Sequence, residues 1–190
     1  MKRSTLALLL LLLGSVVNAN PLDEGLAAFH AGNYSQAFEL WKPLAEGGDA
    51  KAQYNIGLLF MNGLGVERNL VYARELFHAA AHQGMADAQY NLGLIFFEGM
   101  SVFRSNREAH QWWTLAANQG HAAAQFNLGH LYIIGSGTPR NIERGFQLWE
   151  SSAQQGYPQA VETLARVYES GEIDNRRDPQ RAQYWRERAK

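Results

Sequence analysis

The sequence predicts an all-α solenoid of antiparallel helix pairs, and two periodic features carry that prediction. A six-residue phrase, Ala-Gln-aromatic-Asn-aliphatic-Gly, recurs every 36 residues, beginning at Ala52, Ala88 and Ala124, with a divergent fourth copy beginning at Ala160. A glycine keeps the same step, at Gly48, Gly84, Gly120 and Gly156. A repeat of this length is typical of helical arrays, in which each unit buries its apolar face against its neighbours.

The helices can be placed along the chain from turn residues and apolar spacing. Residues 20–47 are predicted to form a capping hairpin, with helices at 20–32 and 34–46 around the turn at Gly32. Three longer units follow at 48–84, 85–120 and 121–156, and a final unit at 157–190 closes the stack. Their first helices are expected at 49–62, 85–98 and 121–134, and their second helices at 70–82, 106–118 and 142–154.

Small residues at fixed positions predict close packing within each pair. Gly57, Gly93 and Gly129 fall in the middle of first helices, where a glycine costs about 1 kcal/mol of helix stability. Close approach to the second helix offsets that cost, so we expect these glycines to face its small residues, Ala73, Ala109 and Gly145. Five residues with capping side chains stand where second helices begin: Asn33, Asn69, Ser105, Asn141 and Asp178.

At these residues the chain resembles the Sel1-like repeat (SLR), a relative of the tetratricopeptide repeat. The second unit carries the pattern most fully, from Gly57 through Gly63-Leu64-Gly65-Val66 and Ala73-Arg74-Glu75-Leu76-Phe77 to Gln83-Gly84. Ser101 replaces the second loop glycine of the third unit, and Thr163 and Ala165 replace the Asn and Gly of the last. The resemblance implies a right-handed α/α superhelix that works as a protein-binding adaptor, often at the bacterial envelope.

In tetratricopeptide-like arrays the first helix of each pair lines a concave groove, so the resemblance also implies where a partner binds. The residues predicted to form this partner-binding groove are Tyr54, Leu58, Met61, Tyr90, Leu94, Phe97, Glu98, Phe126, His130, Ile133 and Arg166. Aromatic anchors would give affinity and charges would set the register. Alternatively, the aromatic residues at positions 54, 90 and 126 belong to the packing of the repeat itself.

The N-terminus predicts export. Basic residues at Lys2 and Arg3 precede an apolar run from Leu6 to Val17, and small residues follow up to Ala19. This order is that of a signal peptide spanning residues 1–19, and the apolar run is shorter than the ~20 residues of a membrane-spanning helix. We therefore expect a periplasmic or secreted protein that is not stably inserted in a membrane; a membrane anchor is the alternative.

Composition excludes several function classes. The net charge is −1, which disfavours nucleic-acid binding because phosphate contacts need clustered Lys and Arg. The chain has no cysteine, so it has no disulfide, thiolate nucleophile or Cys-ligated zinc. The basic C-terminal tail, from Arg176 to Lys190, is read as a solvated cap, with contact to an acidic partner or anionic lipid as the alternative.

The sequence offers weak signals for chemistry. His78 and His82 share a helix face, as in zinc-binding H-E-x-x-H motifs, but the glutamate is missing and the register places both outward, so we expect no metal and no cofactor. Ser136 lacks the context of a nucleophile elbow, and groove carboxylates such as Glu98 or Glu162 are expected to be solvated or to pair with Arg166. We therefore predict no catalytic residues.

The function predicted from the sequence is that of a non-enzymatic adaptor whose partner is another protein, either an envelope complex subunit or a toxin. An immunity protein that masks a secreted toxin is one alternative, since the resemblance includes such members. A hydrolase of β-lactams or of cell-wall-like substrates is the other. The enzymatic members it would resemble are rich in cysteine, which this chain lacks.

Overall fold

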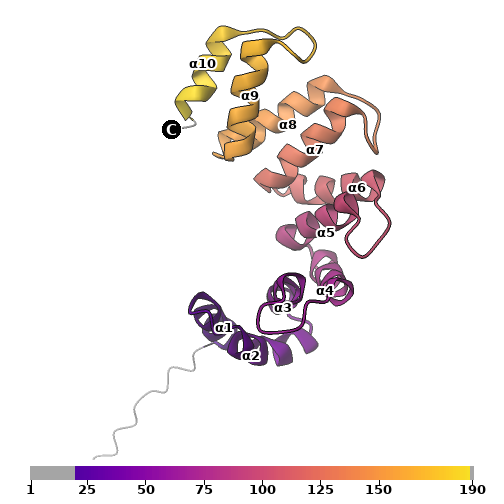
Figure 1. The fold of residues 1–190 in the computed structure, drawn as a ribbon, viewed down its shortest axis with the longest axis vertical. Coiled ribbons are helices and arrows are strands. Elements are labelled where there is room, and N and C mark those ends of the chain that lie inside the picture. Colours follow the sequence, from indigo (N-terminus) through magenta and orange to yellow (C-terminus); the bar gives the residue numbers. More distant parts are fainter. Residues whose placement is uncertain (1–19, 189–190) are drawn as a thin grey trace, which may run out of the picture.

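The chain forms a curved stack of helix pairs. The computed structural model describes residues 20–188, and within that range all regular structure is helical. The pairs follow one another along an arc, with the first and last pairs at its two ends (Figure 1). Each helix packs chiefly against the helices next to it in the sequence. The prediction of an all-α solenoid is therefore confirmed, whereas the predicted signal peptide at 1–19 lies outside the described residues.

The helices of residues 20–188 form five consecutive pairs. They are α1 (Pro21–His30) with α2 (Tyr34–Glu46), α3 (Ala50–Asn62) with α4 (Leu70–His82), α5 (Ala86–Glu98) with α6 (Asn106–Asn118), α7 (Ala122–Ile134) with α8 (Ile142–Gln154), and α9 (Pro158–Ser170) with α10 (Pro179–Arg188). In the three central pairs every helix ends at the predicted residue and begins within one residue of it. None of the described helices is both long and apolar enough to cross a membrane.

Side chains cap the second helices at four of the five predicted positions. The Asn69, Ser105 and Asn141 side chains accept hydrogen bonds from backbone N–H groups three residues later, at 3.0, 3.2 and 2.9 Å. Asp178 does the same for Gln180 and Arg181. The prediction is wrong for Asn33, which makes no such bond. Its backbone, at ψ 60°, is not as extended as that of the other caps, whose ψ lies near 95°.

The loop with serine in place of glycine keeps the shape of its neighbours. Gly65 and Gly137 have φ of 68° and 72°, the left-handed region that favours glycine, and Ser101 at the equivalent position has φ 62°. The Ser101 hydroxyl donates a hydrogen bond to the carbonyl of Leu70 in the preceding pair, at 3.3 Å. This bond helps to offset the backbone strain of a non-glycine residue, so the departure from the repeat pattern leaves the loop intact.

The mid-helix glycines lie against aromatic rings of the second helix. A Cβ atom on Gly93 would lie 2.2 Å from Cδ1 of Trp113, and one on Gly57 would lie 2.7 Å from Cε1 of Phe77. The small facing residue that the sequence predicted is among the nearest neighbours at Gly129, whose Cβ would lie 2.9 Å from the carbonyl oxygen of Gly145 as well as close to Trp149, whereas at Gly57 and Gly93 the nearest atoms belong to an aromatic ring.

The glycines let the indoles reach the helix backbone. The N–H of Trp113 donates to the carbonyl of Tyr90 at 3.2 Å, and that of Trp149 donates to the carbonyl of Phe126 at 3.0 Å. Each carbonyl lies three residues before the glycine, on the same helix face. Because a buried indole N–H needs an acceptor, the glycine and the tryptophan form one unit, and the glycine's cost in helix propensity is offset by this contact.

A chain of glutamine amides links successive repeats. In the third unit, the Gln119 amide donates to the Gln89 side-chain oxygen at 2.7 Å, and the Gln89 amide donates to the carbonyl of Ala81 on α4 at 3.2 Å. The second and fourth units repeat this arrangement 36 residues earlier and later: Gln83 with Gln53 and Ala45, and Gln155 with Gln125 and Ala117. Directional bonds therefore fix the rotation between α2 and α3, α4 and α5, and α6 and α7.

Removing the buried amide of this chain should destabilise the protein. Gln89 is only 4% exposed, so Gln89→Ala removes two hydrogen bonds from a buried position, the one to the Ala81 carbonyl and the one from the Gln119 amide. We expect the free energy of unfolding to fall by about 1–3 kcal/mol, measured by urea denaturation. The matched control is Gln154→Ala, an exposed glutamine, for which we expect a change within about 0.5 kcal/mol. Equal unfolding midpoints for the two variants would contradict the role of the chain.

Candidate functional site

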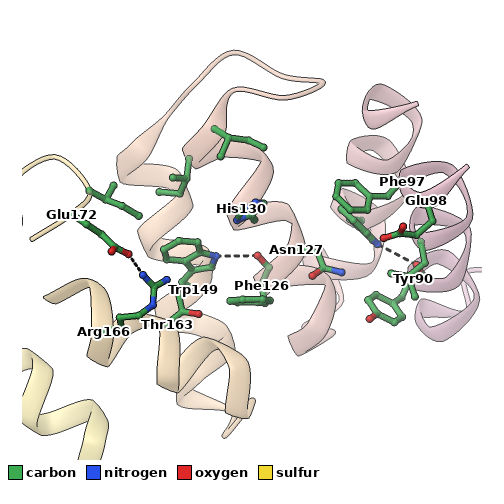
Figure 2. A pocket seen from close by; sticks show the side chains of 15 residues that line it. Tyr90, Phe97, Glu98, Phe126, Asn127, His130, Trp149, Thr163, Arg166 and Glu172 are labelled. Carbon is green, nitrogen blue, oxygen red and sulfur yellow. Dashed lines mark hydrogen bonds and ion pairs between the residues drawn. The ribbon is translucent and has the colours of Figure 1, made fainter. Parts of the chain in front are cut away.

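A groove of about 750 Å³ runs across three successive repeats. Its lining comes from the first helices α5, α7 and α9, from tryptophans of α6 and α8, and from the loop after α9. The residues that line it are Tyr90, Leu94, Phe97, Glu98, Trp113, Phe126, Asn127, His130, Ile133, Ile134, Trp149, Thr163, Arg166, Glu172 and Ile173. Figure 2 shows Tyr90, Phe97 and Glu98 on one side, and Phe126 and Trp149 with Arg166 and Glu172 on the other.

The 36-residue register explains how the groove is built. Equivalent positions on α5, α7 and α9 present Leu94, His130 and Arg166, so the same site changes from apolar to charged along the stack. Phe97 and Ile133 are likewise equivalent, and both contribute to the apolar part of the lining. Because all repeats share one backbone pattern, a different side chain at an equivalent position changes the lining of the groove and leaves the fold unchanged.

Eight of the eleven residues predicted for the groove lie in its lining: Tyr90, Leu94, Phe97, Glu98, Phe126, His130, Ile133 and Arg166. The other three, Tyr54, Leu58 and Met61, lie on α3 and pack against the apolar core shared by α4 and α5. Tyr54 also accepts a hydrogen bond from the Asn91 amide at 3.4 Å and packs on Phe77. The groove of this structure therefore begins at α5, and α3 contributes none of its lining.

Sequence reasoning missed residues that come from outside the first helices. Trp113 and Trp149 line the groove from α6 and α8, and their spacing opposite the helix glycines is the signal that could have identified them. Both are nearly fully buried, at 1% and 2% exposure, so only their faces reach the groove. Glu172 and Ile173 come from the irregular loop after α9, where no repeat pattern points to them.

The charges of the groove sit at its two ends. Arg166 pairs with Glu172 and, within residues 20–188, with neither Glu98 nor Glu162, for which the sequence left open pairing with Arg166 or solvation. The reason is position: the loop after α9 returns beside Arg166, whereas Glu98 lies on α5, two pairs away. Glu98 makes no ion pair within residues 20–188, and its carboxylate is the unneutralised charge of the lining.

Tyr90 and His121 form a stacked pair beside the groove. Their rings lie 4.6 Å apart and nearly parallel. Nδ1 of His121 accepts the backbone N–H of Ala124 at 3.1 Å and so caps α7, a role that the sequence did not predict for this histidine. Its Nε2 faces Asp87 at 3.4 Å. Burial raises the pKa of Tyr90, which keeps its phenol neutral at physiological pH.

The candidate catalytic serine lies outside the groove. Ser136 belongs to the loop between α7 and α8, and its hydroxyl accepts a hydrogen bond from the Asn106 amide of α6. His110, one turn further along α6, packs edge-on against Tyr132, and burial lowers its pKa. No hydrogen bond joins Ser136 to His110 among the described residues, so the base that would activate a nucleophile is not in place.

Three arginines of the C-terminal tail form ion pairs within the chain. Arg176 pairs with Glu143 at 2.8 Å and Arg181 with Glu150 at 3.1 Å, while Arg186 pairs with Glu169. Arg181 also donates to the Tyr168 hydroxyl at 2.7 Å. These pairs tie α10 and the preceding loop to α8 and α9, which favours the capping role of the tail over contact with an anionic surface.

Comparisons with known proteins agree with this architecture. Sel1 repeats match residues 23–49, 50–85, 86–121, 122–157 and 163–190. A Sel1 repeat protein from Oxalobacter formigenes is 32% identical, with a TM-score of 0.82, and the match covers 90% of this chain and 68% of that one. The protective antigen c5321 of uropathogenic Escherichia coli, which displays an SLR fold, is 29% identical with a TM-score of 0.81 over 89% of this chain and 37% of that one.

More remote structures add nothing to the functional argument. The immunity protein Pa5087 from Pseudomonas aeruginosa is 18% identical with a TM-score of 0.48 over 90% of this chain and 85% of that one, a likeness too low to carry an inference. No curated protein sequence matches the chain. The repeat matches cover most of residues 20–188, and they coincide with helix pairs whose geometry was described above. The chain belongs to the Sel1 repeat family.

Proposed function

We propose that the protein is a non-catalytic adaptor that holds a segment of another protein in the groove across α5, α7 and α9. Sel1 repeats are in general protein-interaction modules, and the fold supplies no chemistry of its own. The observation that carries the proposal is the lining: rigid aromatic and aliphatic side chains form its centre, and charged groups lie at its ends. Buried aromatic anchors surrounded by polar groups are the arrangement typical of protein interfaces.

The groove chemistry suggests the kind of segment that binds. Its apolar centre suits a helix or extended strand that presents large apolar side chains on one face. Glu98 is the free carboxylate at the α5 end, so a Lys or Arg of the partner would complement it there, while Arg166 and Glu172 neutralise each other at the α9 end. We therefore propose an amphipathic partner segment with a basic residue next to its apolar face.

We further propose that the protein acts in the bacterial envelope after export. The support is the sequence of residues 1–19, which has the basic start, apolar run and small residues of a signal peptide. The partner would then be another envelope or exported protein. A fusion of residues 1–30 to a periplasm-dependent reporter tests this part separately, because inactivity of the reporter would remove the export proposal without affecting the groove.

The groove is tested by placing a charge at its centre. His130 is exposed in the lining, so His130→Glu adds a negative charge without disturbing the core. We expect the wild-type protein to capture a partner from the envelope fraction of its source cells, and the His130→Glu variant to lose at least about tenfold in affinity for that partner, as for a desolvated charge without a counter-ion. The captured protein is then purified and its dissociation constant measured.

The matched control changes an exposed leucine elsewhere. Leu115 on α6 is 48% exposed and does not line the groove, so Leu115→Arg should leave the dissociation constant unchanged. Equal melting temperatures of the two variants exclude unfolding as the cause of lost binding. If the His130→Glu variant retained every captured protein, the groove proposal would be contradicted, and the interface would have to lie on another face.

A further inference from the structure

Two histidines converge on the exposed side of α4, away from the groove. His78 and His82 lie one helical turn apart, and their Nε2 atoms are 3.2 Å from each other. Both rings meet the indole of Trp112 on α6 edge-on, with centroids 5.8 and 5.7 Å away. The two Nε2 atoms therefore lie next to each other on the exposed side of the helix, and both rings pack against one tryptophan.

The repeat register shows that packing does not demand these histidines. The position of His78 is held by Thr114 and Glu150 in the following repeats, and that of His82 by Asn118 and Gln154. These equivalents are polar residues of unlike shape, and the helices around them have the same length and capping. The imidazole pair is therefore particular to this one repeat, and the fold of the repeat does not require it.

The separation of the two nitrogens matches that of ligands on one metal ion. Imidazole nitrogens lie roughly 2.0–2.1 Å from a bound zinc ion, so two of them at a tetrahedral angle are roughly 3.3 Å apart, and at a right angle roughly 2.9 Å. The observed 3.2 Å falls between these values. We propose that His78 and His82 chelate a divalent transition-metal ion, Cu²⁺ or Zn²⁺, through their Nε2 atoms.

Coordination also fixes the tautomer of each ring. Coordination through both Nε2 atoms requires each ring to carry its proton on Nδ1. The ring that donates in the free histidine pair moves its proton from Nε2 to Nδ1 when the metal enters.

The site is open on its outer side. No group of three or more His, Cys, Asp or Glu residues able to hold a metal occurs in residues 20–188, so the pair supplies two ligands and water completes the shell. Arg74, whose positive charge reaches His78, opposes the bound cation. Binding is therefore exchangeable, and among divalent ions Cu²⁺ should bind more tightly than Zn²⁺, following the general order of affinities for nitrogen ligands.

Trp112 provides a direct readout because it contacts both rings. The purified protein, without a histidine tag, is titrated with Cu²⁺ while tryptophan fluorescence and heat are recorded. We expect saturation at one equivalent and partial quenching, since Trp112 is one of five tryptophans. The Trp112→Phe variant should keep the calorimetric binding and lose most of the quenching. Zn²⁺ should displace Cu²⁺ only in excess.

Variants of the pair decide the proposal. His78→Gln and His82→Gln should each weaken Cu²⁺ binding at least tenfold and abolish the quenching, and both should fold because repeats with Thr, Glu, Asn or Gln at these positions fold. His30→Gln, an exposed histidine of α1, is the matched control and should bind like the wild type. Absence of saturable binding in the wild type, or equal binding in the His78→Gln/His82→Gln double variant, would overturn the site.

Discussion

Replacing Gly93 with leucine should lower the free energy of unfolding by about 3 kcal/mol or more, the upper range for overpacking a core. Even the first atom of the new side chain would lie 2.2 Å from Trp113, a residue that is only 1% exposed. The indole would also lose its hydrogen bond to the carbonyl of Tyr90. Urea denaturation of the wild type and Gly93→Leu measures the difference, and an unchanged midpoint would refute the contact.

A smaller pair of substitutions separates this contact from helix propensity. Propensity alone predicts that Gly93→Ala stabilises α5 by about 1 kcal/mol. The structure predicts the opposite sign, because the alanine Cβ already overlaps the ring of Trp113. The residue equivalent to Gly93 in the last unit is Ala165. The position equivalent to Trp113 is held there by Arg186, which is not aromatic. There Ala165→Gly should destabilise by about 1 kcal/mol, as propensity predicts.

A second variant keeps the test independent of general damage to the core. In a Trp113→Leu background the ring is gone, so adding Gly93→Ala should be neutral or stabilising. The double-mutant cycle then isolates the coupling between residues 93 and 113. Additive effects of the two substitutions would show that the ring and the glycine do not constrain each other.

Trp149→Ala should cost about 3–5 kcal/mol, the range for truncating a buried tryptophan. Trp149 is 2% exposed, packs on Phe126 and Phe146, and belongs to the core that joins α8 to α9. The effect should reach the last pair first, because each repeat of a solenoid is stabilised by its neighbours. Hydrogen exchange would then show faster opening of α9 and α10 than of α3 and α4.

Trp149→Phe is the matched control for that prediction. It keeps an aromatic ring in the core but removes the indole N–H that donates to the carbonyl of Phe126. That carbonyl lies within α7, so the expected cost is the smaller value of a hydrogen bond and lost contact area, about 1–2 kcal/mol. A Trp149→Ala variant as stable as Trp149→Phe would show that the ring contributes little to the junction.

Periodicity was enough to predict the helices because every repeat restates the same turns and caps. The three central pairs were placed almost residue by residue, and departures such as Ser101 were visible as substitutions at a fixed position of the repeat. The error at Asn33 came from reading a residue type without its backbone, which lacks the extended shape of a cap. The facing residue of Gly93 was misjudged because spacing shows that room is needed and does not show which side chain fills it.

The groove was predictable only for the part that repeats. Leu94 and His130 follow from the first-helix register, whereas Glu172 comes from a loop whose path depends on tertiary packing. Met61 has the register of a groove residue but packs on the neighbouring core, because position on a helix face does not determine how deeply a flexible side chain is covered. The sequence placed His78 and His82 on one helix face but led us to expect no metal there, and the Cu²⁺ or Zn²⁺ site proposed for them rests on the distance between their Nε2 atoms.

The chain of glutamine amides stops before the last pair, and this has a consequence for the groove. The next residue in its register after Gln125 is Val161, which is 2% exposed and packs without directional bonds. The junction between α8 and α9 is held instead by Tyr168 of α9, which donates to Glu150 of α8 at 2.8 Å, and by the ion pairs of Arg181 with Glu150 and of Arg176 with Glu143. Since α9 carries one side of the groove, the placement of that wall depends on charged partners, whereas neutral amides set the earlier junctions, so it is the part of the groove most sensitive to ionic strength.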